Sequence, residues 1–458
     1  MNALIISALL GVVMMFSSFM LKEKRIIRNI AIGGVLLLLV STIFELNGNV
    51  FFRIDTRGMI YFDRFALLFN TIVFAATFIY YLLSAKEMEK VGSHYAEYFA
   101  LLFFILCGII LVSSFKSLLI LFLGIEIISI PLYILTGSDK KSLKSNEAAL
   151  KYFLLGAFST GILLMGITLI YGDKGSFFTS QINLATGPPS ALMIAGMSFL
   201  FFAMSFKVSA APFHFWTPDV YDGAPTVFTS FMATIVKAAV FIAFIRLFDE
   251  AFGLLQAKWQ LWLAVITAAT LFIGNITAVF QQSVKRMLAY SSIAQAGFML
   301  LAIYAMNAEA KEGLLFYSAA YGLATIGIFA VLIRMNDYSI DGFNGLAKKH
   351  PLLAFTTTIF LLSLAGIPLT AGFLAKFYML KAAVATNKHL WLVIFAVLMA
   401  AVGVYYYFRV IQAMYFKNGD PGEIRVTPVF TWSLFILAII IIVLGIFPNL
   451  LLYWYYFS

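Results

Sequence analysis

Lysine and glutamate side chains lie inside several strongly apolar segments of this 458-residue chain. Lys237 lies in "SFMATIVKAAVFIAFI", and Glu126 lies in "LLILFLGIEIISIPLYILTG". If these segments span a bilayer, each charge costs about 2.5–3.5 kcal/mol, and such residues commonly mark ion or proton paths. The chemistry that these residue types predict is proton transfer between buried acids and bases. For Lys237 the alternative is a structural lysine bonded to carbonyl groups in a tight bundle.

Two further lysines lie beside proline breaks. In "FKVSAAPFHFWTPDVYDGAP", Lys207 precedes Pro212 and His214 follows it, and in "SLAGIPLTAGFLAKFYMLKAA" Lys376 follows Pro368. A proline inside a helix removes a backbone donor and clashes with the preceding turn, so we expect Pro212 to end one half of its helix. Irregular backbone at membrane depth is tolerated only beside protein or a water-filled cavity. Each break therefore predicts a hydrated pocket beside a lysine.

Glu126 needs a partner if it is to stay ionised, because burial favours a neutral carboxyl group and a nearby ammonium favours the charged one. Lys207 is the obvious candidate. Lys151 follows Glu147 by four residues in "SNEAALKYF", the favourable order for an ion pair on one helix. A local ion pair at the membrane interface and a place on a proton path both explain Lys151, and both remain open.

Other polar residues also allow two interpretations. His214 is either a relay group or a structural imidazole, and Asp219 and Asp222 are expected to be loop and helix-capping residues. Two polar runs either line water or form hydrogen bonds between helices. Their residues are Tyr290, Ser291, Ser292 and Gln295 in the first run, and Tyr317, Tyr321 and Thr325 in the second.

The elements that must hold these groups are membrane-spanning helices. The chain is 62% hydrophobic and 11% charged, whereas soluble domains are about half apolar and a quarter charged. Apolar runs of about twenty residues, the length that crosses a bilayer, recur throughout the chain. About fourteen spans are expected, at 2–21, 29–46, 59–84, 96–114, 117–136, 147–171, 191–211, 226–248, 259–280, 286–305, 312–334, 351–385 with an interruption, 391–415 and 429–455.

The fold class predicted from these patterns is an all-α polytopic membrane protein with two inverted-topology repeats, each containing a proline-broken helix. The expected parts are N-terminal helices in 1–95, a first repeat in 96–250 with its break near 191–225, a second repeat in 251–416 with its break near 351–385, and a C-terminal helix in 417–458. Basic loop residues are more frequent on one side of this topology, which places both termini outside.

Composition also excludes several classes of function. The single cysteine and four widely spaced histidines offer no haem, cluster or metal site. The net charge of +10 comes mainly from short loops between apolar runs, which argues against a nucleic-acid partner. No phosphate loop, dinucleotide fingerprint or nucleophile–base arrangement is present. We therefore expect no cofactor on this chain.

Five motifs together resemble a known family over nearly the whole chain: "FKVSAAPFHFWTPDVYDGAPT", "GIEIISIPLYIL", "NEAALKYFLLGAFSTGILLMGITLIYG", "KRMLAYSSIAQAGFML" and "AGIPLTAGFLAKFYML". They are similar to the antiporter-like membrane subunits of proton-pumping NADH:quinone oxidoreductase, respiratory complex I, and to the N type among them. The segment 312–334 lacks the histidine and lysine that the L, M and sodium/proton antiporter relatives carry there.

This resemblance implies roles for individual residues. Glu126 and Lys207 match a coupled pair, Lys237 a central lysine, and Lys376 a lysine facing the exit side. Lys151 matches a further family lysine and His214 a family histidine. Opening the Glu126–Lys207 pair would make Lys207 a better proton donor towards Lys237 through water, and Lys376 would pass the proton outwards.

The resemblance also implies an assembly. NADH, FMN, iron–sulfur clusters and quinone are expected in other subunits, whose redox chemistry drives the relay. An M-type neighbour, small membrane subunits and the lipid bilayer are the expected partners, in a bacterial inner membrane with both termini periplasmic. The alternatives are a subunit of a sodium/proton antiporter and a purely structural membrane subunit.

Overall fold

The computed structural model describes residues 1–183 and 188–456, and within these residues it is helical with three isolated β-bridges and no strand. The helices are α1 (Asn2–Met20), α2 (Lys24–Leu46), α3 (Arg64–Ser84), α4 (Tyr95–Ser114), α5 (Leu118–Thr136), α6 (Leu143–Lys174), α7 (Thr179–Asn183), α8 (Ala191–Lys207), α9 (Trp216–Gly223), α10 (Thr226–Phe231), α11 (Lys237–Phe252), α12 (Gln256–Val279), α13 (Val284–Ala305), α14 (Ala308–Leu332), α15 (Leu346–Lys349), α16 (Pro351–Ala365), α17 (Ala371–Val384), α18 (Leu390–Phe416), α19 (Pro428–Ile446) and α20 (Asn449–Tyr456). The prediction of an all-α membrane protein is confirmed.

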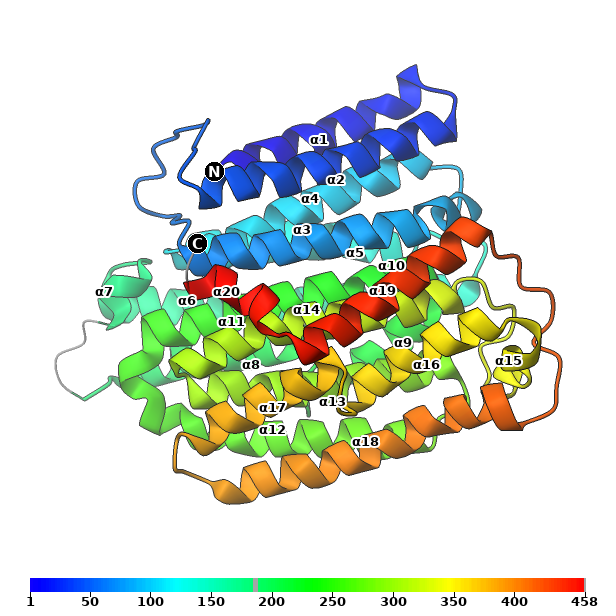
Figure 1. Cartoon of the computed structure of the whole chain (residues 1–458). Helices are drawn as coiled ribbons and strands as arrows, with labels where there is room; N and C mark the ends of the chain where they lie inside the picture. Colours follow the sequence, from blue (N-terminus) through cyan, green and yellow to red (C-terminus); the bar gives the residue numbers. More distant parts are fainter. Residues whose placement is uncertain (184–187, 457–458) are drawn as a thin grey trace.

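Eleven helical segments are long and apolar enough to cross a membrane, and α8 and α16 are shorter apolar helices. The segment Thr226–Val279 turns back at Gly253–Leu255, so it makes two passes, and each broken helix makes one. The described residues therefore make fourteen passes. Both termini lie at the same end of the bundle, here called the terminal end (Figure 1).

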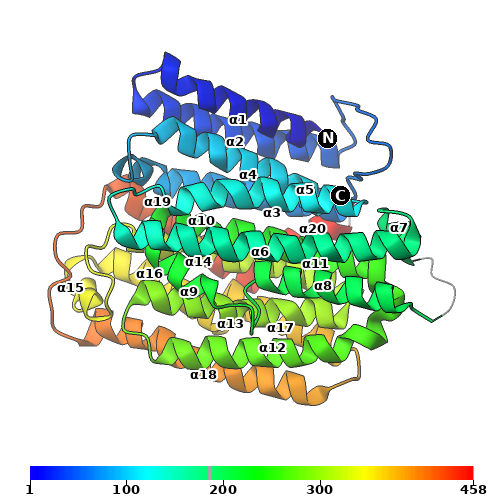
Figure 2. The same ribbon diagram turned by 180° about the vertical axis from the view of Figure 1, so that it is seen from behind.

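The helices run roughly parallel in a flattened bundle (Figures 1 and 2). Helices α1 and α2 form one edge, and α18 forms the opposite edge beside α12. The 18-residue apolar window of α14 is completely buried, and α13 is buried along nearly all of its length. Helices α11, α13 and α14 thus form the core of the bundle.

Two helices are broken where the prolines predict it. Helix α8 ends at Lys207, and α9 begins only after the irregular residues 208–215, which contain Pro212. Helix α16 ends at Ala365, and the next residue, Gly366, has a φ of +83° that closes the helix in a left-handed turn, a conformation that glycine adopts without strain. Helix α17 then begins close by, and a Cβ on Gly372 would lie 1.8 Å from the carbonyl oxygen of Ser363.

A third irregularity was not predicted. Residues Met232–Val236 form a π-helical turn between α10 and α11, directly before Lys237. Single π-turns inside α-helices are rare and are frequent at functional sites. The turn changes the direction in which the following side chains leave the helix axis.

Corresponding links of the two halves share a pair of backbone hydrogen bonds. Each link precedes a serine-capped helix, α5 after Ser117 and α13 after Ser283. The bonds are Leu118 N to Phe177 O (2.9 Å) and Thr179 N to Lys116 O (3.0 Å) in the first half, and Val284 N to Tyr338 O (2.7 Å) and Ile340 N to Gln282 O (2.9 Å) in the second. The first set lies at the terminal end and the second at the opposite end, the relation that inverted repeats require.

Candidate functional site

Lys237 begins α11 immediately after the π-turn and is only 2% exposed. Its ammonium donates to the carbonyl oxygen and to the hydroxyl of Ser292 on α13, both at 2.9 Å. It also lies 5.8 Å from the centre of the Tyr221 ring, within the range of a cation–π contact. A lysine is therefore held at the centre of the bundle by neutral partners, as the sequence predicted for its position.

Lys376 on α17 closes the end of α16. Its ammonium donates to the carbonyl oxygens of Leu364 (3.0 Å) and Ala365 (2.8 Å), which lack helical partners because α16 stops there. The Phe298 ring lies 4.9 Å from the ammonium. The carbonyl end of a helix carries partial negative charge, so the break creates a site that favours a cation.

A polar cluster on α13, α14 and α18 lies between these two lysines. Gln295 donates to the same Leu364 carbonyl oxygen as Lys376 (2.9 Å) and to the Tyr407 hydroxyl (3.3 Å). The Tyr317 hydroxyl donates to the Gln295 amide oxygen, and Tyr407 bonds Ser291. Ser291 is adjacent to Ser292, which holds Lys237, so polar side chains extend from one lysine to the other.

Glu126 and Lys207 are not joined in the way the sequence predicted. Lys207 donates to the Ser129 hydroxyl at 2.9 Å, whereas Glu126 accepts from Thr160 at 2.8 Å. Within residues 1–183 and 188–456, no ion pair of 4.0 Å or less joins the two. Ser129 follows Glu126 by three residues and lies on the same face of α5. Lys207 therefore binds α5 one helical turn away from Glu126, through the Ser129 hydroxyl.

Lys151 and Asp219 take part in an ionic network at the end opposite the termini. Lys151 pairs with Glu147 (2.7 Å), as predicted, and also with Asp219 (2.8 Å), which in turn pairs with Arg286 of α13 (3.0 Å). These residues border a cleft of about 270 Å³. The interpretation of Asp219 as a capping residue was wrong, since its carboxylate joins α6 to α13.

Lys285 is a buried cation that lies just outside the expected span 286–305. It lies in the first turn of α13, is 4% exposed, and donates to the carbonyl oxygens of Asp222 (2.8 Å) and Ala224 (2.7 Å) at the end of α9. Asp222 accordingly contributes a backbone carbonyl rather than a side-chain cap. Together with Arg286, Lys285 ties the second half of the broken helix to α13.

His214 lies in the break between α8 and α9 and is 6% exposed. Its ring packs against Phe215 at 4.6 Å between centroids. Its Nδ1 atom has no hydrogen-bond partner in the described part of the chain. The imidazole is therefore buried in the break, and its Nδ1 atom is available for a further contact.

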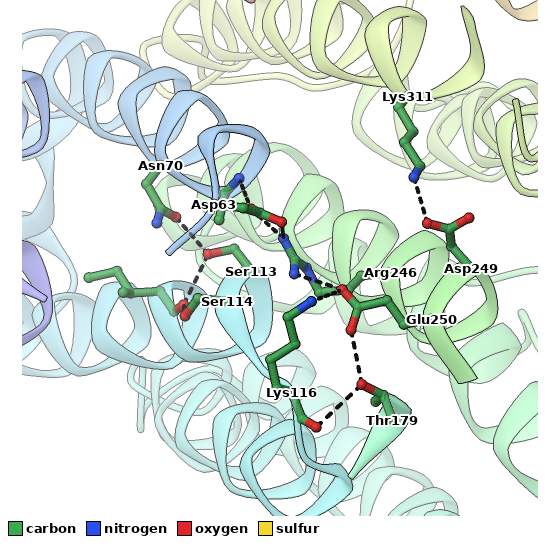
Figure 3. Close-up of polar contacts among 12 residues, drawn as sticks. Asp63, Asn70, Ser113, Ser114, Lys116, Thr179, Arg246, Asp249, Glu250 and Lys311 are labelled. Atoms are coloured by element: carbon green, nitrogen blue, oxygen red, sulfur yellow. Dashed lines mark hydrogen bonds and ion pairs between the residues drawn. The ribbon is translucent and has the colours of Figure 1, made fainter. Parts of the chain in front are cut away.

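Arg246 lies near the end of α11, is 4% exposed, and takes part in an ionic cluster at the terminal end (Figure 3). It donates to both carboxylate oxygens of Asp63 at 2.6 Å and to Glu250 at 2.9 Å. Glu250 also pairs with Lys116 at 2.8 Å, and the neighbouring Asp249 pairs with Lys311. The cluster joins α3, α11, α14 and the α4–α5 link.

Sequence reasoning missed Tyr407, Lys285 and Arg246 as site or framework residues. Tyr407 stands in "GVYYYFRV", where sequence does not show that Tyr406 and Tyr407 are buried and Tyr405 is exposed, nor which of them joins the polar cluster. Lys285 and Arg246 lie near helix ends, where a basic residue ordinarily signals a loop. In the described ranges, no group of three or more His, Cys, Asp or Glu side chains is arranged to hold a metal ion.

Comparisons with known proteins agree with this architecture. Residues 116–417 match the family described as NADH:quinone oxidoreductase/Mrp antiporter, TM. Subunit N of NADH-quinone oxidoreductase from Cytophaga hutchinsonii is 39% identical over 99% of both chains, and that of Flavobacterium psychrophilum is 36% identical over the same share of both.

Solved structures lead to the same group. A chain of respiratory complex I from Thermus thermophilus with bound aureothin is 31% identical, with a TM-score of 0.85 over 98% of both chains. A chain of the Mrp complex from Dietzia sp. DQ12-45-1b shares the fold, with a TM-score of 0.87 at 18% identity over 99% of this chain and 95% of that one. The chain therefore belongs to the NADH:quinone oxidoreductase/Mrp antiporter family and, within it, to the subunit N group of membrane subunits.

Proposed function

We propose that this chain translocates protons across the membrane, as a membrane-arm subunit of NADH:quinone oxidoreductase, through Glu126, Lys207, Lys237 and Lys376. Lys151 and His214 are proposed as additional members of the relay. Redox chemistry in other subunits supplies the driving force. The proposal includes the repeat boundaries 96–250 and 251–416, so that each repeat contributes one broken helix with its lysine.

The observation that carries the proposal is the polar connection between Lys237 and Lys376. Both ammonium groups are buried, and neither has a carboxylate within ion-pairing distance in the described ranges. Their partners are carbonyl and hydroxyl oxygens, and Gln295 shares the Leu364 carbonyl oxygen with Lys376. An amine without a counter-ion releases its proton more easily than one locked in an ion pair, which suits a relay.

The proposed direction follows the arrangement of the bundle. The polar cleft around Lys151 and Asp219 lies at the end opposite the termini, where basic loop residues are more frequent. We place that end in the cytoplasm and both termini in the periplasm of a bacterial inner membrane. An M-type antiporter-like subunit and small membrane subunits are the proposed neighbours, with NADH, FMN, iron–sulfur clusters and quinone bound elsewhere in the complex.

The test is NADH-driven acidification of inverted membrane vesicles carrying Lys237→Ala, with Lys258→Ala as the control because Lys258 is exposed on α12. We expect pumping and coupled NADH oxidation to fall with Lys237→Ala and to stay normal with Lys258→Ala. Unchanged pumping and turnover in both variants would refute the relay. Sodium-dependent proton exchange without NADH would instead support the antiporter alternative.

A further inference from the structure

The break between α8 and α9 is tied to the second half of the chain through one threonine. The backbone N–H of Ala211 donates to the hydroxyl oxygen of Thr270 on α12 at 2.8 Å, and both residues are fully buried. Ala211 lies four residues after Lys207 and three residues before His214. The bond therefore joins a helix of the second repeat to the backbone between two residues that we assign to the relay.

The other hydrogen bonds of the break are local. The N–H groups of residues 208–210 donate to carbonyl oxygens of residues 204–206 at 2.9–3.0 Å. The Trp216 indole N–H donates to the Phe206 carbonyl oxygen at 3.0 Å. These bonds fix the shape of the turn, but they do not fix its position in the bundle. Among the described residues, the Ala211–Thr270 bond is the hydrogen bond that connects 208–215 to a distant element.

Packing holds the break weakly on the side of α6. An apolar cavity of about 360 Å³ lies there, bordered by residues of α6 and α8 and by Pro212, Phe213 and Trp216. Phe215, in the same segment, is 73% exposed. Side chains that are packed without gaps hold a segment firmly, and the cavity leaves this side of the break without such packing. The contact with α12 therefore contributes strongly to the position of the break.

The Thr270 hydroxyl is oriented to accept this bond. It donates its own hydrogen to the Ile266 carbonyl oxygen, one turn earlier on α12, at 2.6 Å. A hydroxyl group has one hydrogen and two lone pairs, so this bond leaves the lone pairs for an external donor. The branched Cβ of threonine also restricts rotation of the side chain in a helix. The acceptor is thus fixed by α12 itself and does not depend on the break.

We propose that Thr270 is a positioning residue, whose hydroxyl holds the first broken helix against the second repeat and so sets the places of Lys207 and His214. The inference rests on the proposed function, since it concerns how two members of the relay are held. The second break is held within its own repeat, where Gln295 and Lys376 both donate to the Leu364 carbonyl oxygen. Loss of the Thr270 hydroxyl should therefore disturb the first break and leave the second unchanged.

Three substitutions on α12 test this role. Thr270→Val keeps the shape of the side chain and removes the acceptor of Ala211, whereas Thr270→Ser keeps the hydroxyl. Thr267→Val is the matched control, because Thr267 lies one turn earlier, is 0% exposed, and has a hydroxyl without a partner in the described residues. These variants and Lys207→Ala are compared in the assembled complex for the amount of chain, for NADH-driven pumping, and for hydrogen–deuterium exchange of 208–215 and 366–370.

We expect Thr270→Val to speed exchange in 208–215 about tenfold. This factor equals about 1.4 kcal/mol and lies within the cost of leaving a buried donor unpaired. Exchange in 366–370 should not change. A displacement of about 1 Å in a positioned group can slow a reaction up to about a hundredfold, so pumping should fall about tenfold. Thr270→Ser should restore most of the pumping, and Thr267→Val should match the unmodified chain in all measurements.

Equal exchange or equal pumping in Thr270→Val and Thr267→Val overturns the positioning role. An assembly defect of Thr270→Val, or a failure of Thr270→Ser to restore pumping, overturns it as well. If Lys207→Ala pumps poorly while Thr270→Val pumps normally, the relay stands and the positioning role fails. Normal pumping by Lys207→Ala overturns the proposed function at this residue together with the positioning role that rests on it.

Discussion

Replacing Lys237 or Lys376 by methionine should have very different effects on stability, although both replacements should stop pumping. Methionine keeps the length and the apolar stem of lysine and removes the charge. Both ammonium groups are buried, at 2% and 8% exposure, so the cost of burying the charge is similar and largely cancels in the comparison. What differs is the set of acceptors left behind.

Lys237→Met should leave no orphaned acceptor. The Ser292 hydroxyl still donates to the Ala289 carbonyl oxygen at 2.9 Å, and the Ser292 carbonyl lies in the middle of α13, where the helix backbone also uses it. Lys376→Met leaves the Ala365 carbonyl at the end of α16 without its donor, while the Leu364 carbonyl keeps Gln295. An unpaired buried carbonyl costs about 1–3 kcal/mol, and losing a cation at a helix carboxyl end costs up to about 2 kcal/mol.

The expected difference between the two variants is therefore about 1–5 kcal/mol, with Lys376→Met the less stable. A difference of about 2.7 kcal/mol corresponds to roughly a hundredfold change in an equilibrium. The measurement is the rate at which the chain is lost from the detergent-solubilised complex on heating, since unfolding of such assemblies is governed by kinetics. Equal rates, or faster loss of Lys237→Met, would contradict the assignment of Lys376 as the group that closes α16.

Two further substitutions test the framework. Asp63→Asn should destabilise the chain by about 1.5–3 kcal/mol, because the charge opposite buried Arg246 is lost. Asp63→Ala should cost about 1 kcal/mol more, because the Asp63 carboxylate also caps α3 at Ala66 N. The same heating experiment checks both variants, and equal loss rates would argue against the capping contribution. Gly372→Ala should reduce the amount of chain in membranes severely, since its Cβ would overlap the Ser363 carbonyl, whereas Gly161→Ala, which has open space around it, should not.

Much of the fold could be predicted from sequence because membrane-spanning helices leave a strong local signal. Apolar runs of bilayer length predicted the number of passes, and Pro212 and Pro368 marked the two breaks. The buried positions of Lys237 and Lys376 also followed from the apolar residues on both sides of them. These features depend on neighbours along the chain, and the sequence displays such neighbours directly.

The partners of these residues depend on contacts between distant segments. Lys207 bonds Ser129 rather than Glu126, a choice set by how α5 and α8 meet and by the bond that Thr160 offers to the glutamate. Tyr407 joins the polar cluster because one of three adjacent tyrosines turns towards α13. The π-turn before Lys237 contains no proline or glycine from which it could be predicted. Tertiary packing decides these features, and local sequence carries little of that information.

The ionic cluster of Figure 3 has a consequence for movement in this protein. The end of α11 is fixed by Arg246, Asp249 and Glu250, which bond groups on α3, α14 and the α4–α5 link. Displacing α11 as a rigid rod would break all of these contacts together. The π-turn lies at the other end of the same helix, next to Lys237. A rearrangement that alters the surroundings of this lysine would therefore be a local twist within 226–236. Lys237 would change its direction while the ionic contacts at the terminal end of α11 remain in place.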